Sequence, residues 1–271
     1  MFRLENKIAW ITGAASGLGK ELSIGLAKKG MRLVLIDKDS AGLDEMVSIL
    51  EPGNYIRLCV DISSPSDLEN QLERIDAGFK NIDVLINCAG ITSIGFIDDT
   101  SLEAFKQIVD VNFYSALVLI KKVLPIMKKK QSGQIVNISS AMGRRSTPIT
   151  TPYCTSKAAL TSLTEGLRVE VEDDNINVML VYPGPMRTNM MFSYELYSTE
   201  LYPAMEEYKR KLKPPSPQKM ASKIIRGIEK QSRQVKKFTP VEFFLLINFF
   251  FPAVADKIMK FIYLRKLIKR D

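Results

Sequence analysis

The chain has 271 residues, of which 46% are hydrophobic and 25% are charged, a size that suits one α/β domain or two small ones. It has no histidine and three widely separated cysteines, so the sequence predicts neither a disulfide framework nor a metal site. The net charge of +8 is concentrated in residues 232–271, which hold nine Lys/Arg and three Asp/Glu. Because this basic excess carries no nucleic-acid-binding motif, we expect no nucleic-acid partner. The first residues lack the cationic start and apolar run of a signal peptide, which favours a cytoplasmic protein.

Six short runs rich in Val, Ile and Leu predict strands that are buried on both faces. They span 7–12, 32–37, 55–60, 83–87, 133–139 and 176–182. Segments of helical length lie between the strands, at 18–29, 65–79, 101–130 and 153–173. A Lys/Pro cluster at 209–219 predicts a surface connection. The alternation of strands and helices predicts an α/β fold with a Rossmann-type, doubly wound parallel sheet.

A glycine-rich turn, "TGAASGLGK", follows the first predicted strand. Gly13, Gly17 and Gly19 would let the backbone approach a pyrophosphate, and the helix that follows offers free N–H groups. The GxxxGxG spacing differs from the standard GxGxxG fingerprint, so a merely tight strand–helix turn is the alternative.

Asp37 ends the second predicted strand, eighteen residues after Gly19. A carboxylate at this place would accept hydrogen bonds from the adenosine ribose and repel a 2′-phosphate. NAD(H) is therefore favoured as the cofactor, and NADP(H) is the alternative because Lys38 follows directly. The other interpretation makes Asp37 an ordinary turn residue.

Tyr153 and Lys157 stand four residues apart at the start of a predicted helix, where positions i and i+4 share a face. A nearby ammonium favours a phenolate, so we expect Lys157 to lower the pKa of Tyr153. Taken alone, such a pair is common on solvated helix surfaces. It is informative here because Asn112 and Ser139–Ser140 precede it in the chain.

Seven motifs in chain order make residues 5–240 resemble the short-chain dehydrogenase/reductase family. They are "TGAASGLG" (12–19), "DIS" (61–63), "NCAG" (87–90), "NFYS" (112–115), "NISS" (137–140), "YCTSK" (153–157) and "PGPMRT" (183–188). The resemblance implies hydride transfer between a nicotinamide and a carbonyl or alcohol. It also implies four catalytic residues, Asn112, Ser140, Tyr153 and Lys157, with Ser140 chosen over Ser139 because the family's serine stands thirteen residues before the tyrosine.

The resemblance gives each of these residues an expected role. Tyr153 would be the general acid/base, Ser140 would bind the substrate oxygen, Asn112 would hold a relay water, and Lys157 would hold the nicotinamide ribose. The expected cofactor-binding residues are Gly13, Ser16, Gly17, Leu18, Gly19, Asp37, Asp61, Ile62, Asn87, Ala89, Gly90, Tyr153, Lys157, Pro183, Gly184 and Thr188. The sequence departs from the family pattern at Cys88, where Asn is common, and at Pro185 and Met186. A homodimer or homotetramer is also implied.

The region that covers the substrate in this family is rich in apolar side chains. They are Met186, Met190, Met191, Phe192, Tyr194, Leu196, Tyr197, Leu201 and Tyr202. Met and aromatic side chains suit an apolar pocket, so we expect a lipophilic alcohol or ketone as substrate. The alternative is a lid that simply packs on the core.

Two other functions remain open from the sequence. One is a catalytically silent dinucleotide-binding regulator, which the intact catalytic residues argue against. The other is an epimerase or dehydratase on the same fold, for which the chain leaves no room for a larger C-terminal substrate domain.

We expect residues 1–240 to form the dinucleotide-binding and catalytic domain and residues 241–271 a hydrophobic and basic extension. The stretch 243–255 has thirteen uncharged residues, five of them Phe. As a helix it would measure about 20 Å, too short for a hydrocarbon core of about 30 Å. Peripheral membrane contact is expected because basic residues flank the stretch, namely Lys236, Lys237, Lys257, Lys260, Arg265, Lys266, Lys269 and Arg270. Packing over the substrate cleft or a second subunit is the alternative, since 256–270 show no clean apolar helix face.

Overall fold

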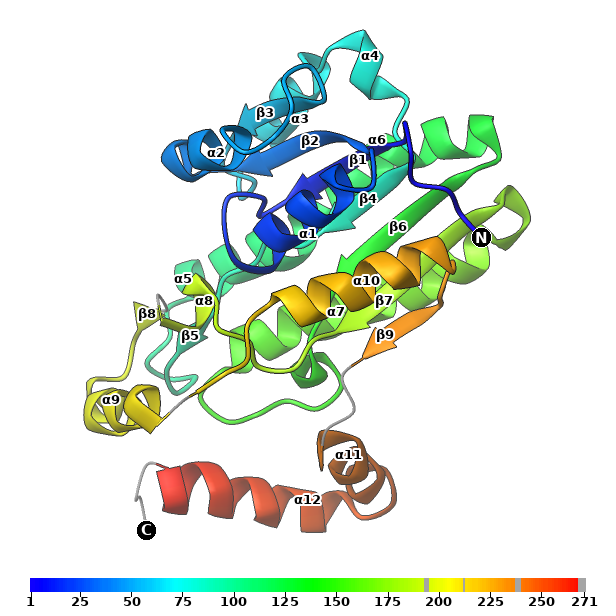
Figure 1. Cartoon of the computed structure of the whole chain (residues 1–271). Helices are drawn as coiled ribbons and strands as arrows, with labels where there is room; N and C mark the ends of the chain where they lie inside the picture. The colour runs from blue at the N-terminus through cyan, green and yellow to red at the C-terminus, as the bar shows by residue number, and fades with distance from the viewer. Residues whose placement is uncertain (193–194, 212, 237–239, 268–271) are drawn as a thin grey trace.

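The computed structural model describes residues 1–192, 195–211, 213–236 and 240–267 (Figure 1). Its centre is a seven-stranded sheet in the order β3-β2-β1-β4-β6-β7-β9, and every neighbouring pair is parallel. The strands are β1 (Ile8–Thr12), β2 (Arg32–Asp37), β3 (Tyr55–Cys59), β4 (Val84–Asn87), β6 (Gly133–Ile138), β7 (Ile176–Tyr182) and β9 (Gln234–Lys236). A small second sheet pairs β5 (Ser93–Ile94) with β8 (Glu195–Leu196).

Helices cover both faces of the sheet. One face packs against α1 (Gly17–Ala27), α2 (Ser40–Val47) and α10 (Gln218–Glu229). The other packs against α3 (Pro65–Glu73), α6 (Ser115–Lys130) and α7 (Thr151–Glu170). Because successive strand residues point to opposite faces, Ala9 and Ile11 enter the first core while Ile8 and Trp10 enter the second. This two-sided burial explains why the central strands are apolar at most positions.

The remaining helices are shorter or lie farther from the sheet, and one of them still contributes Phe79 to the second core (Figure 1). They are α4 (Ala77–Lys80), α5 (Leu102–Val109), α8 (Asn189–Phe192), α9 (Tyr202–Lys211), α11 (Pro240–Phe250) and α12 (Pro252–Met259), and a π-helical segment, Lys260–Leu267, continues α12. None of the described helices combines the length and the apolar character needed to cross a membrane.

The predicted doubly wound parallel sheet is confirmed, and each of the six expected strands lies within one residue of its predicted bounds. The long helix expected at 101–130 is interrupted. It consists of α5, a π-helical turn at Asp110–Tyr114, and α6. Such turns insert an extra residue into a helix and are common at functional sites. The sequence analysis did not predict α2, α10 or β9.

The strand order places a ligand crevice at a definite edge of the sheet. β1 lies between β2 and β4, so the connections that follow β1 and β4 leave the sheet on opposite sides. Ligands of such sheets bind at this switch point, outside the carboxyl ends of the strands. The glycine-rich turn after β1 and residues 87–90 after β4 are both located there.

Candidate active site

The glycine-rich turn is held in a conformation that only glycine adopts easily. Gly13 has a φ of +69° and Gly17 a φ of +53°. Gly19 lies directly against Gly13, because a Cβ on Gly19 would stand 2.0 Å from the Gly13 carbonyl oxygen. The three glycines thus fold the backbone tightly around the N-terminus of α1, whose first N–H groups remain available to an anion.

Asp37 fastens the glycine-rich turn to the end of β2. Its Oδ2 accepts a hydrogen bond from the Ala15 N–H at 3.0 Å, and its Oδ1 accepts one from the Asp39 N–H at 3.1 Å. A carboxylate oxygen can accept two hydrogen bonds, so both oxygens keep capacity for a ribose hydroxyl. Asp37 therefore has a structural role, in holding the glycine-rich turn, that the sequence analysis did not foresee.

Residues 87–90 form the wall of the crevice after β4. The Thr12 hydroxyl accepts hydrogen bonds from the N–H groups of Cys88 and Ala89, each at 3.0 Å. Asn87 is buried and donates to the Asn137 side chain at 2.8 Å. Within the described residues, the Asn87 Oδ1 has no hydrogen-bond partner. A buried hydrogen-bond acceptor without a donor lowers the stability of the fold, so this wall is a place where a bound ligand could donate a hydrogen bond.

Asn112 is the middle residue of the π-helical turn, and its side-chain amide makes three hydrogen bonds. Its Oδ1 accepts from the Ile91 N–H at 2.8 Å, and its Nδ2 donates to the Ile91 carbonyl and to the Ser156 hydroxyl, both at 2.9 Å. Both N–H donors are used, and one acceptor site on Oδ1 remains. Asn112 thus links residues 90–91 to helix α7, which carries Tyr153 and Lys157.

Ser140, Tyr153 and Lys157 meet beside the carboxyl end of β6. The Ser140 hydroxyl lies beside the Tyr153 phenol and lowers its pKa, and the Lys157 Nζ lies 5.9 Å from the centre of the Tyr153 ring. Lys157 is 3% exposed, and its ammonium donates to the Ile138 carbonyl at 2.9 Å. Ser139 points elsewhere, because its hydroxyl donates to the Lys157 carbonyl.

Burial dominates the electrostatics of this group. It raises the pKa of the Tyr153 phenol to about 12, against a smaller lowering by the Ser140 side chain. Burial also lowers the pKa of the Lys157 ammonium to about 8. The pKa of Tyr153 is thus shifted in the direction opposite to the expected lowering, because burial has the largest effect on the phenol.

Gly90 is the point where these elements converge. A Cβ on Gly90 would stand 3.1 Å from the Asn112 Oδ1, 3.3 Å from the Lys157 Nζ and 3.3 Å from the Met190 methyl. A side chain on Gly90 would fill the space between the wall formed by residues 87–90 and the Lys157 ammonium. Together with the glycine turn, Asp37 and the unpartnered Asn87 oxygen, this space fits a nicotinamide dinucleotide.

The other predicted cofactor-binding residues are distributed around the crevice. Thr188 faces the glycine-rich turn, since a Cβ on Gly17 would stand 3.1 Å from the Thr188 Cβ. Ser16 is the N-cap of α1, and Pro183 and Gly184 follow the carboxyl end of β7. Leu18 and Ile62 belong to the two cores, while Asp61 is exposed and accepts from the Ser63 N–H at 2.9 Å.

The region expected to cover the substrate is partly packed into a small core of its own. Leu201 is fully buried there with Ile149 and Met205, and Leu196 packs against them. Met190 instead faces Gly90, and Tyr202 is exposed. Tyr194 lies outside the described residues. Some of the apolar side chains in this region therefore pack the lid, and Met190 lies beside Gly90 and the Lys157 ammonium.

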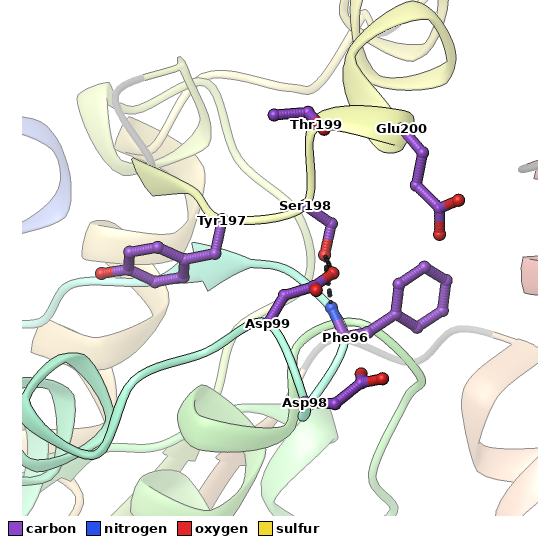
Figure 2. A pocket seen from close by; sticks show the side chains of 7 residues that line it. All are labelled: Phe96, Asp98, Asp99, Tyr197, Ser198, Thr199 and Glu200. Atoms are coloured by element: carbon purple, nitrogen blue, oxygen red, sulfur yellow. Dashed lines mark hydrogen bonds between the residues drawn. The ribbon is translucent and has the colours of Figure 1, made fainter.

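A polar cavity of about 360 Å³ lies beside this lid, at the β5–β8 ribbon. Figure 2 shows Ser198 pointing to Asp99 and to the backbone of Phe96, while the Tyr197 ring points away from them. The Ser198 hydroxyl accepts from the Phe96 N–H at 2.8 Å and is hydrogen-bonded to the Asp99 carboxylate. The residues that line this cavity include none of the four predicted catalytic residues, so we interpret it as the attachment of the lid.

Several residues that shape the site were not singled out by the sequence analysis as site residues. Ile138 and Ile91 act through backbone groups, which no side-chain pattern reveals. Ser156 and Thr12 act through hydroxyls. The signal for these two was available, because both stand inside the motifs "YCTSK" and "TGAASGLG".

Comparison with known proteins agrees with this geometry. A family model described as short chain dehydrogenase matches residues 7–196. The chain is 31% identical over 246 residues to dehydrogenase/reductase SDR family member 7B of Bos taurus, a match that covers 88% of this chain and 75% of the relative.

Solved structures show the same fold over the body of the chain. A short-chain dehydrogenase from Streptomyces avermitilis has a TM-score of 0.80 at 25% identity, covering 97% of this chain and 98% of that one. A 4-hydroxyisoleucine dehydrogenase complexed with NADH has a TM-score of 0.73 at 27% identity, covering 85% of this chain and 96% of that one. The crevice, the matched family model and these relatives lead to one conclusion: the chain belongs to the short-chain dehydrogenase/reductase family and is an NAD(P)-dependent oxidoreductase.

Proposed function

We propose that the enzyme interconverts a lipophilic secondary alcohol and its ketone, with NAD(H) as the favoured cofactor and Tyr153 as the general acid/base. The observation that carries the proposal is the convergence of Asn112 and Lys157 on Gly90, with Ser140 and Tyr153 next to each other beside them. The bound nicotinamide would supply or accept the hydride. The residues of the chain would orient the substrate and move the proton.

Tyr153 and Ser140 would bind the substrate oxygen from one side. With a pKa raised to about 12, the Tyr153 phenol keeps its proton at neutral pH and can donate it to a carbonyl oxygen. The Ser140 hydroxyl would hydrogen-bond the same oxygen while its charge changes. The protonated phenol suits carbonyl reduction, and alcohol oxidation would need the phenolate.

Lys157 and Asn112 would support the proton donor and the cofactor. The buried Lys157 ammonium would hold the nicotinamide ribose and place a positive charge near Tyr153. The remaining acceptor site on the Asn112 Oδ1 would hold the water of a proton relay, while its other hydrogen bonds keep residues 90–91 in place. Asp37 would select NAD(H), because its carboxylate stands at the ribose end of the crevice and repels a 2′-phosphate.

The lipophilic substrate is supported by Met190, which faces the catalytic group at Gly90. A homodimer or homotetramer is proposed from family resemblance alone. A catalytically silent dinucleotide-binding protein is the competing function, and the grouping of Ser140, Tyr153 and Lys157 at one place argues against it.

A panel of hydroxy and keto compounds of graded hydrophobicity, assayed with NAD(H) and NADP(H) at the nicotinamide absorbance, tests the proposal. We expect turnover of an apolar ketone with NADH and a higher kcat/KM as the apolar part of the substrate grows. If NADH binds but no compound is turned over, the silent binding protein becomes the better interpretation.

A further inference from the structure

The C-terminal helices expose an apolar surface that the catalytic function does not use. Phe243, Leu246 and Phe250 lie on one face of α11 at i, i+3 and i+7, and Phe249 borders them. The surface continues over the turn into α12 and along the π-helical segment. Its members are Phe243, Leu246, Phe249, Phe250, Phe251, Val254, Phe261 and Ile262, with exposed fractions from 45% to 77%. We call these eight residues the apolar tail surface.

The apolar tail surface is held in place by the opposite side of the same helices. Ala255 is fully buried, and Asp256 forms an ion pair with Arg145. Tyr263 packs against the small core that contains Ile149. Arg145 and Ile149 belong to the segment between Ser140 and Tyr153. The tail is thus attached beside the catalytic group, and the Phe side chains face outward.

A cleft of about 460 Å³ separates the tail from this segment. Arg145, Pro148 and Thr151 line one side, and Lys257, Met259 and Lys260 line the other. Asp256 also lines the cleft and is paired with Arg145. The exposed Lys257 and Lys260 give the cleft a positive charge beside the apolar tail surface.

We propose that the apolar tail surface docks on an anionic membrane, with its Phe side chains among the acyl chains and lipid phosphates at the basic cleft. Exposed aromatic side chains next to Lys and Arg are the features that bind a protein to an anionic bilayer surface. The apolar area comes from two helices and their turn, which is why a helical wheel of 256–270 alone shows no apolar face. Among the flanking basic residues, Lys237, Lys269 and Arg270 lie outside the described residues.

A second copy of this chain is the less favourable occupant. A twofold interface through this surface would place two identical segments opposite each other. Residues 232–271 hold nine basic and three acidic residues, so the two copies would repel each other where an anionic membrane would attract each of them.

Flotation with vesicles of phosphatidylcholine, alone or with about one third phosphatidylserine, tests this surface in the full-length protein. We expect the parent to float with the anionic vesicles, and added salt to weaken binding. The double variant Phe249→Ser/Phe250→Ser should float at least tenfold less than the parent. Lys257→Gln with Lys260→Gln should reduce the preference for anionic vesicles.

The matched control is Ile49→Ser with Val169→Ser, which removes two exposed apolar side chains elsewhere and should float like the parent. The proposal is overturned if the parent stays at the bottom with both vesicles, or if the Phe variant floats as well as the control. It is also overturned if light scattering shows a dimer that only the Phe variant dissociates. None of these readouts needs turnover, so they are independent of the proposed reaction.

Discussion

Replacing Gly19 by alanine tests how tightly the glycine-rich turn is built, and Gly166 provides the matched control. Both residues are helical, in α1 and α7, and alanine is favoured over glycine in a helix interior by about 0.5–1 kcal/mol. At Gly166 the new Cβ has nothing within 4 Å, so Gly166→Ala should gain that amount. A gain of about 1 kcal/mol raises the Tm of a chain of this size by about 2 °C.

At Gly19 the same methyl group would lie 2.0 Å from the Gly13 carbonyl oxygen and 2.7 Å from its carbonyl carbon. A real Cβ atom essentially never lies within 3.0 Å of such an atom. The backbone therefore has to move by about 1 Å, and this overpacking costs about 1–3 kcal/mol of folding stability. We expect Gly19→Ala to lower the Tm by a few degrees. Because the movement opens the turn that would hold the pyrophosphate, it should weaken NADH binding at least tenfold.

Differential scanning calorimetry and fluorescence titration with NADH measure the two effects. The reasoning is refuted if Gly19→Ala melts at or above the parent temperature and binds NADH with the parent Kd. A loss of affinity in Gly166→Ala would also refute it, since that residue lies on an exposed part of α7.

Three further predictions follow from the charges of the site. Asp37→Asn should narrow the preference for NAD(H) over NADP(H) at least tenfold in titrations, since the amide keeps an acceptor for the Ala15 N–H and removes the charge. In ketone reduction, kcat/KM for NADH should fall above about pH 8, because Lys157 loses its proton there while Tyr153 stays protonated. The pH dependence of kcat/KM reports the ionising groups of the free enzyme. The free energy of unfolding of the parent, relative to that of Lys157→Met, should rise from pH 8 to pH 10. In this range Lys157 binds more protons in the unfolded chain than in the folded one.

The sheet was predictable because its signal is local. The strands are apolar on both faces, and that pattern requires helices on each side whatever the details of packing. The strand β9 was not predicted, because Gln234–Lys236 is short and lacks an apolar run. Its strand conformation depends on backbone pairing with β7, which leaves no signal in the sequence. The π-helical turn at Asn112 was also hidden, because a single inserted residue leaves the composition of a helix unchanged.

The candidate site could be predicted as a set of side chains, and its electrostatics could not. The spacing of Tyr153 and Lys157 indicated a shared helix face, and the structure places both beside the same crevice. The pKa of Tyr153 depends on burial and on the neighbouring Ser140 and Cys154 side chains, which only the tertiary structure defines. The lid gave a mixed result for the same reason, since Leu201 is used in packing while Met190 faces Gly90.

The most direct test of the central claim compares Tyr153→Phe with the parent in ketone reduction by NADH, using Tyr55→Phe on β3 as the control. General acid catalysis typically contributes about 10²–10⁴-fold, so kcat of Tyr153→Phe should fall at least 10²-fold. Its Kd for NADH should stay within about twofold of the parent, and Tyr55→Phe should match the parent in both. A Tyr153→Phe enzyme that keeps its rate within about tenfold of the parent would contradict the assignment of Tyr153 as the proton donor.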